Sequence, residues 1–104
     1  MTEPEIIVNA IVEMDGAGFA AMKEPLLVMQ AASRSEDGCH DYTFSTELDS
    51  PTTVRITERW DDYESLVAHF ATPHMADFRA AMAAHPPLGG TSGFFEVNEV
   101  SRPS

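Results

Sequence analysis

Residues 33–75 read SRSEDGCHDY, TFSTELDSPTTVRITERW and DDYESLVAHFATPHM in succession, and this stretch decides the fold. Residues 41–49 and 53–60 alternate apolar and polar side chains, which is typical of strands with one covered face. Between them, residues 49–52 have the composition of a turn. The centre of the stretch therefore predicts a β-hairpin.

The end of the stretch predicts a helix broken into two pieces. Asp61 or Asp62 can cap the first piece, whose apolar side chains recur at i, i+3, i+4 and i+7 as far as Phe70. Thr72 is a good N-cap, and Pro73 suits a first helical position. A second piece should therefore start at this point.

Working outward, the flanking segments supply two more strands and a long helix. Residues 6–14 are nearly continuous in apolarity and predict a buried strand, while residues 17–35 follow an amphipathic helical pattern. Pro25 falls inside that helix, so we expect a kink or a later start. Residues 86–90 should end the last helix, and residues 93–101 predict the final strand.

This order is the βαββαβ split motif, an α+β ferredoxin-like fold with a four-stranded antiparallel sheet and the helices on one face. The whole chain, residues 1–104, is expected to form a single domain, since its length and 43% hydrophobic content suit one core.

The first strand has two apolar faces. Alternation places Ile6, Val8 and Val12 on one side and Ile7, Asn9 and Ile11 on the other. The helices of so small a domain can cover only one sheet face. The second apolar face therefore predicts a partner sheet, and hence a homodimer.

Charge narrows the classes of partner. Six basic against seventeen acidic residues give a formal charge of −11, which disfavours nucleic acids and anionic membrane surfaces. The first residues lack the pattern of a signal peptide, and no apolar run approaches the roughly 20 residues that span a bilayer. We therefore expect a cytoplasmic protein. Cys39 is the only cysteine, so the chain forms no internal disulfide.

Three motifs occur in a recognisable order. They are Ser-Arg-x-Glu-x-Gly-Cys-x-x-Tyr at 33–42, Glu-x-Trp at 58–60 and His-x-x-x-Pro-His at 69–74. This order resembles the antibiotic-biosynthesis-monooxygenase-like domains, which are small dimeric α+β barrels that include quinol monooxygenases. The resemblance implies two sheets facing one another across a dimer. It also implies cofactor-free oxidation of a small aromatic substrate, such as a quinol, a polyphenol or an anthrone, by O2.

The sequence offers parts for such a site. Trp60 can form a flat wall for an aromatic ring, and Glu58, if buried, would gain the proton affinity of a useful base. Three side chains can hydrogen-bond a phenolic oxygen: Asn9, His69 and His74. Five further residues are expected to line an apolar cavity between sheet and helices: Phe44, Phe70, Met75, Phe78 and Met82.

Each of these residues also has a structural interpretation. Trp60 and the apolar side chains can be simple core, and Asn9 can satisfy backbone groups at a sheet edge. Glu58 can form an ion pair with an arginine of the partner chain or with one of this chain, the candidates being Arg55, Arg59 and Arg79.

No cofactor or metal is expected. No glycine-rich loop joins a strand to a helix. His69 and His74 are five residues apart with Pro73 between them, so they do not share a helix face, and ordinary polar histidines are favoured over metal ligands. Acidic neighbours of Cys39 oppose thiolate formation, so a core role is favoured.

This chain differs from two kinds of related active site at residues that those sites use. Haem-degrading members use an asparagine, a histidine and a tryptophan; Asn9 fits the first position, but His69 and Arg79 occupy the region of the other two. Anthrone-oxidising members have an asparagine four positions before the tryptophan, where this chain has Ile56.

Three functions follow as hypotheses. The first is a cofactor-independent monooxygenase in which Trp60 stacks on the substrate. The second is a non-catalytic dimeric barrel that holds an apolar metabolite. The third is a non-oxidative acid–base enzyme, such as a decarboxylase or isomerase, because one scaffold hosts several chemistries.

Overall fold

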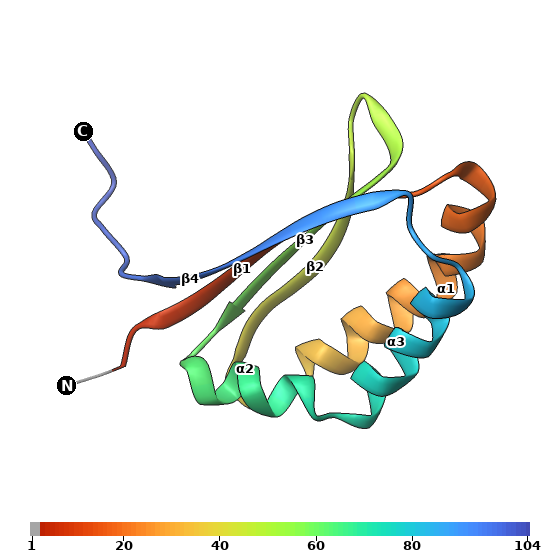
Figure 1. Ribbon diagram of the computed structural model, residues 1–104. Coiled ribbons are helices and arrows are strands. Elements are labelled where there is room, and N and C mark those ends of the chain that lie inside the picture. The colour runs from red at the N-terminus through yellow and green to blue at the C-terminus, as the bar shows by residue number, and fades with distance from the viewer. Residues whose placement is uncertain (1–2) are drawn as a thin grey trace.

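The computed structural model describes residues 3–104, so the first two residues of the predicted domain lie outside it (Figure 1). The elements follow the predicted order, including the broken second helix. They are β1 (Glu5–Glu13), α1 (Gly16–Arg34), β2 (Cys39–Glu47), β3 (Ser50–Trp60), α2 (Tyr63–Phe70), α3 (Pro73–Ala84) and β4 (Gly89–Val97).

The four strands form one antiparallel sheet in the order β2-β3-β1-β4. All three helices lie on the same side of it, which confirms the predicted ferredoxin-like architecture (Figure 1). In the register, Val8 of β1 lies opposite Glu58 of β3 and Phe94 of β4. These three side chains therefore share the helix-covered face.

Side chains at the helix starts act as caps, as the sequence predicts. The Asp62 carboxylate accepts a hydrogen bond from the Ser65 amide at 2.8 Å, and the Thr72 hydroxyl accepts one from the Met75 amide at 3.2 Å. Because each cap satisfies an otherwise free amide, α2 and α3 start at fixed residues. This fixed break sets the positions of the side chains on both helices.

Four predicted boundaries are wrong. The final strand starts at Gly89 rather than at residue 93, because Gly89 and Gly90 pair with Glu13 and Val12 of β1 instead of forming a loop. It also ends at Val97 rather than at residue 101. The hairpin turn is earlier, so β3 already begins at Ser50. Helix α1 begins at Gly16 and continues through Pro25, so the alternative of a later start fails.

The core lies between the sheet and the helices in two adjacent clusters. The first joins the sheet to α1, α2 and the start of α3, and contains Ile6, Val8, Met29, Tyr42, Trp60, Leu66 and Met75. The second joins α1 to β3, and contains Met14, Met22, Leu26 and Val54. Burial of each such side chain contributes about 1.5–3 kcal/mol.

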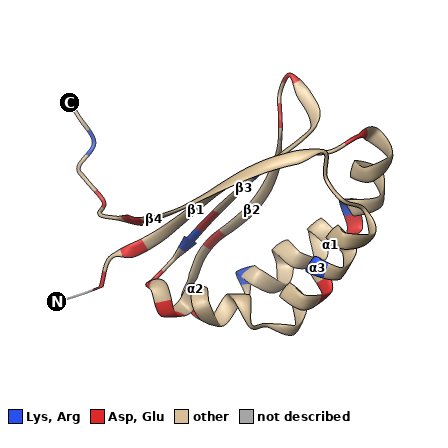
Figure 2. Ribbon diagram, viewed as in Figure 1, with Lys and Arg blue, Asp and Glu red and all other residues tan. Residues whose placement is uncertain are grey.

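The other face of the sheet is not covered by helices. Ile7 and Ile11 are half-buried there, and Phe95 remains 52% exposed. The predicted homodimer would cover this face. No helix within residues 3–104 has the length and apolarity of a membrane span. Figure 2 shows acidic residues on strands and helices alike, with few basic residues among them.

Candidate functional site

The end of β3 places a carboxylate and an indole side by side in the core. Glu58 and Trp60 are two residues apart, so both point toward the helices. The Nε1–H of Trp60 donates a hydrogen bond of 2.9 Å to Oε1 of Glu58. Trp60 is fully buried and Glu58 is only 7% exposed. The condition on which the sequence makes Glu58 a useful base, its burial, is therefore met.

Burial gives Glu58 the proton affinity that the sequence predicts. Loss of hydration raises the pKa of Glu58 to about 7, and the nearby charge of Glu36 acts in the same direction. The hydrogen bond from Trp60 acts in the opposite direction, since it favours the ionised form. A carboxyl group with this pKa can take up or release a proton near neutral pH.

Glu58 makes no ion pair with the candidate arginines of its own chain. Arg55 pairs with Glu47, and Arg59 pairs with Glu5. The guanidinium of Arg79 lies 5.6 Å from the centre of the Phe70 ring. The interpretation of Glu58 as half of an ion pair within the chain is therefore wrong.

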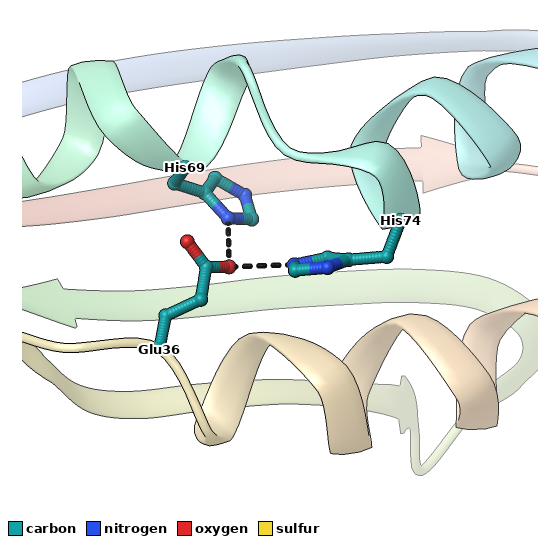
Figure 3. A group of neighbouring side chains, drawn as sticks. All are labelled: Glu36, His69 and His74. Atoms are coloured by element: carbon teal, nitrogen blue, oxygen red, sulfur yellow. Dashed lines mark hydrogen bonds and ion pairs between the residues drawn. The ribbon is translucent and has the colours of Figure 1, made fainter.

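Beside this pair, three segments bring two histidines onto one carboxylate (Figure 3). Glu36 comes from the connection between α1 and β2, His69 from the last turn of α2, and His74 from the first turn of α3. Oε2 of Glu36 lies 2.6 Å from Nδ1 of His69 and 2.7 Å from Nε2 of His74. Since an ionised carboxylate only accepts hydrogen bonds, each imidazole donates an N–H.

The His69 ring is enclosed by aromatic side chains. It is fully buried, with its centre 4.7 Å from that of Trp60 and 5.3 Å from that of Tyr42. Burial lowers the pKa of His69, which favours the neutral ring, although Glu36 opposes this effect. While Nδ1 bonds Glu36, Nε2 is buried and has no hydrogen-bond partner among residues 3–104. An unsatisfied buried nitrogen costs about 1–3 kcal/mol, and a ligand could recover that energy.

Asn9 does not join this site. It lies opposite Thr57 of β3 and Gly93 of β4, on the face of the sheet away from the helices, where it is exposed. Val8 occupies the corresponding helix-covered position. Within one chain, the sheet therefore separates Asn9 from His69 and His74. Of the three side chains expected to hydrogen-bond a phenolic oxygen, only His69 and His74 lie on the helix side of the sheet within one chain.

The five predicted cavity residues do not line one cavity. Phe44 and Phe78 stack on each other with their centres 5.8 Å apart, while Met75 is buried and Met82 packs against the core. Phe70 is 41% exposed and faces Phe94 of β4, with ring centres 6.2 Å apart. Helix packing has filled the space that the sequence pattern left open, and only Phe70 borders the main apolar recess.

That recess lies between α2 and β4 and has a volume of about 480 Å³. Its lining residues are Tyr63, Leu66, Val67, Phe70 and Phe94. Leu66 is also part of the core cluster that contains Trp60. The recess is therefore separated from the buried aromatic site by a side chain that belongs to both.

Two site residues, Glu36 and Tyr42, have no role in the sequence-based site. Both belong to the motif at residues 33–42, so the motif is the signal that could have identified them. Cys39 belongs to the same motif, and the sequence favours a core role for it. Burial, followed by the charge of Glu36, raises the pKa of its thiol to about 11, which agrees with a non-nucleophilic cysteine.

The architecture and the enclosed cluster of Trp60, His69 and Glu58 define a ferredoxin-like α+β domain with a polar aromatic site beneath its helices. The model of the family described as antibiotic biosynthesis monooxygenase matches residues 6–81, and the chain belongs to that family. The resemblance stated from the motifs is thereby confirmed. No curated protein matches the chain.

Solved structures of similar proteins support the fold. One is a candidate antibiotic biosynthesis monooxygenase from Deinococcus radiodurans, with 24% identity, a TM-score of 0.87 and coverage of 95% of this chain and 98% of that chain. Another is a protein of unknown function from Bacteroides thetaiotaomicron, described as a possible oxidoreductase, with 23% identity, a TM-score of 0.83 and coverage of 91% and 99%.

Proposed function

We propose that the protein is a cofactor-independent monooxygenase that oxidises a small aromatic substrate, such as a quinol, polyphenol or anthrone, with O2. Family membership supports monooxygenation in general. The observation that carries the specific proposal is the buried Nε2 of His69, which lacks a partner within 3–104 and lies on a ring packed against Trp60. A phenolic hydroxyl is a fitting partner, because it can donate a hydrogen bond to Nε2 while Nδ1–H is bonded to Glu36.

The substrate enters through the recess between α2 and β4. Its volume of about 480 Å³ lies within the range of small-molecule sites, and its lining is apolar and aromatic. Leu66 lines this recess and also belongs to the core cluster of Trp60, so a movement of its side chain would let the substrate approach Trp60 and His69. Such side-chain movements accompany substrate binding in many enzymes.

The chemistry requires one proton acceptor and an electron-rich substrate. Glu58 takes a proton from the substrate, and the resulting anion transfers one electron to O2. The substrate radical and superoxide combine into a hydroperoxide after protonation, and the hydroperoxide loses water. One oxygen atom remains in the product and the other leaves as water, so the substrate itself supplies all four electrons. A dry site protects the radical pair from side reactions.

The alternative is a non-catalytic barrel that binds an apolar metabolite. The complete burial of Trp60 favours it, because a core residue needs no substrate to explain its position. Turnover separates the two functions, and oxygen dependence separates the proposed enzyme from a non-oxidative one.

The test is oxygen consumption by metal-stripped protein with a panel of quinols and anthrones and no added cofactor. Heat-denatured protein measures autoxidation. Saturable uptake that falls more than about tenfold in Glu58→Gln supports the proposal, because a positioned base contributes about 10²–10⁴-fold. Glu47→Gln, which alters an exposed ion pair, is the matched control. Uptake that is equal in wild type and Glu58→Gln would remove Glu58 from the mechanism.

A further inference from the structure

We propose that Glu36, His69 and His74 form a binding site for one divalent transition-metal ion, such as Zn²⁺, Co²⁺ or Fe²⁺. One carboxylate oxygen and two imidazole nitrogens lie within 4.8 Å of one another (Figure 3). The proposed oxygenase does not require this ion, so the site is an additional property of the protein.

The donor set selects the kind of ion. Imidazole nitrogen is a good ligand for zinc, iron and cobalt, whereas Mg²⁺ and Ca²⁺ prefer sites built from oxygen alone. Two histidines and one carboxylate also leave coordination positions free for water or another ligand. The three residues therefore resemble an open site more than a closed structural one.

The spacing of the ligand atoms is close to what an ion needs. Oε2 of Glu36 now lies at hydrogen-bond distances of 2.6 and 2.7 Å from the two nitrogens. Bonds of about 2.0–2.1 Å to each atom require separations of roughly 3.0–3.4 Å, so Oε2 must move about half an ångström further from each nitrogen. The ion takes the place of the two bridging protons, which are released on binding.

Burial differs among the three ligands in a way that allows entry. The His69 side chain is fully buried, whereas the side chains of Glu36 and His74 remain 13% and 22% exposed. His74 also lines a recess of about 250 Å³ between α1 and α3, together with Asp77. An ion can therefore arrive from the His74 side and meet a fixed ligand at the bottom.

The wider charge distribution favours a cation, with one local exception. The formal charge of −11 attracts cations to the surface. The positive charge of Arg79 lies near His69 and disfavours a further positive charge at that ring. Because Glu36 contacts both histidines directly, its charge acts at a shorter distance.

Metal binding would alter the buried aromatic site, because it would change which nitrogen of the His69 ring carries the proton. The ion binds Nδ1, and a neutral imidazole then carries its proton on Nε2. Nε2 of the ring that packs against Trp60 thus becomes a donor, whereas a ring that donates Nδ1–H to Glu36 leaves Nε2 as an acceptor.

The experiment is a titration of the metal-stripped full-length protein with Co²⁺, followed by its visible absorption bands and by displacement with Zn²⁺. We expect one equivalent to bind. Glu36→Gln and His74→Ala should weaken binding by more than about tenfold, since even loss of an outer partner costs 10–100-fold. His85→Ala is the matched control, because His85 is exposed and outside the cluster.

Three results would overturn the proposal: no saturable binding, equal binding in all four proteins, or binding abolished by salt as at a diffuse acidic surface. The cluster would then serve as a hydrogen-bonded link between α1 and the break between α2 and α3. Circular dichroism on each variant confirms that it folds. Oxygen uptake is measured on the metal-free protein, so this site and the proposed function can fail separately.

Discussion

The indole N–H of Trp60 donates a hydrogen bond to the carboxylate of Glu58 two residues before it, in a core that excludes water. The bond stabilises the charge that burial opposes. Because both side chains come from one strand, the pair is set by the geometry of β3 and does not depend on a distant loop. Four predictions follow from this pair and from the fold around it.

Glu58 should make the protein less stable as the pH rises. Its pKa is about 7 in the folded protein against an ordinary value of 4.5, so the folded state holds the proton more tightly than the unfolded state. Stability is therefore highest below the unfolded pKa and is lost as the pH rises from about 4.5 through about 7. The loss is on the order of 3 kcal/mol, at about 1.4 kcal/mol for each pKa unit.

Urea unfolding at pH 5 and pH 8 measures this loss, and Glu58→Gln should remove it. The buried His69 has a lowered pKa and acts in the opposite direction. The comparison with Glu58→Gln therefore isolates the carboxyl group. An identical pH dependence in the two proteins would show that Glu58 does not carry the shift.

Trp60→Phe should raise the pKa of Glu58 further, because phenylalanine keeps an aromatic wall but donates no hydrogen bond. Under the proposed function, the pH at which oxygen uptake reaches half its maximum should move upward. Trp60→Ala is a poorer probe, since removing a fully buried tryptophan costs about 3–5 kcal/mol. If the pH profile of Trp60→Phe is the same as that of the wild type, the indole N–H does not influence the pKa of Glu58.

Phe95→Glu should convert a homodimer into monomers. Phe95 is on the sheet face without helices and 52% exposed, and a charge at a buried sheet-to-sheet interface would be strongly unfavourable. Gel filtration with light scattering measures the mass. Leu48→Glu, at the exposed tip of the hairpin, is the control and should leave the mass unchanged. A wild-type protein that elutes as a monomer would refute the dimer itself.

Gly38→Ala should destabilise the fold by roughly 1–3 kcal/mol. Gly38 has a φ of +81°, and a Cβ atom there would collide with the side chain of Ser65 on α2. Gly16→Ala is the matched control, because no atom within 4 Å opposes a Cβ at that position. Equal unfolding midpoints for the two variants would contradict the assigned geometry of the turn.

Local patterns were sufficient to predict the element order and the caps, and to place Glu58 and Trp60 on one face of their strand. Periodicity and capping act within a few residues, so one sequence contains them. The start of β4 was missed because Gly89 and Gly90 look like a loop until β1 is available to pair with them. Pairing with β1 outweighs the low strand propensity of these two glycines.

The site was harder to predict, for a different reason. Alternation separated Asn9 from Val8 but left open which of them shares a face with Trp60, because that depends on the register between β1 and β3. The convergence joins Glu36, in the connection between α1 and β2, to His69 and His74, which follow 33 and 38 residues later in the chain. The spacing argument was correct that the histidines do not share one helix, but two helices bring them together.

The strand order leaves one long side of β4 without a neighbour in the described chain. β4 carries only one charge, Glu96, and two exposed phenylalanines, whereas the opposite outer strand carries Asp41 and Glu47 as well as His40. An open strand edge with so little charge is a template for aggregation. Concentrated or ageing samples should therefore form intermolecular β-structure first along β4, and an added lysine there should extend their shelf life.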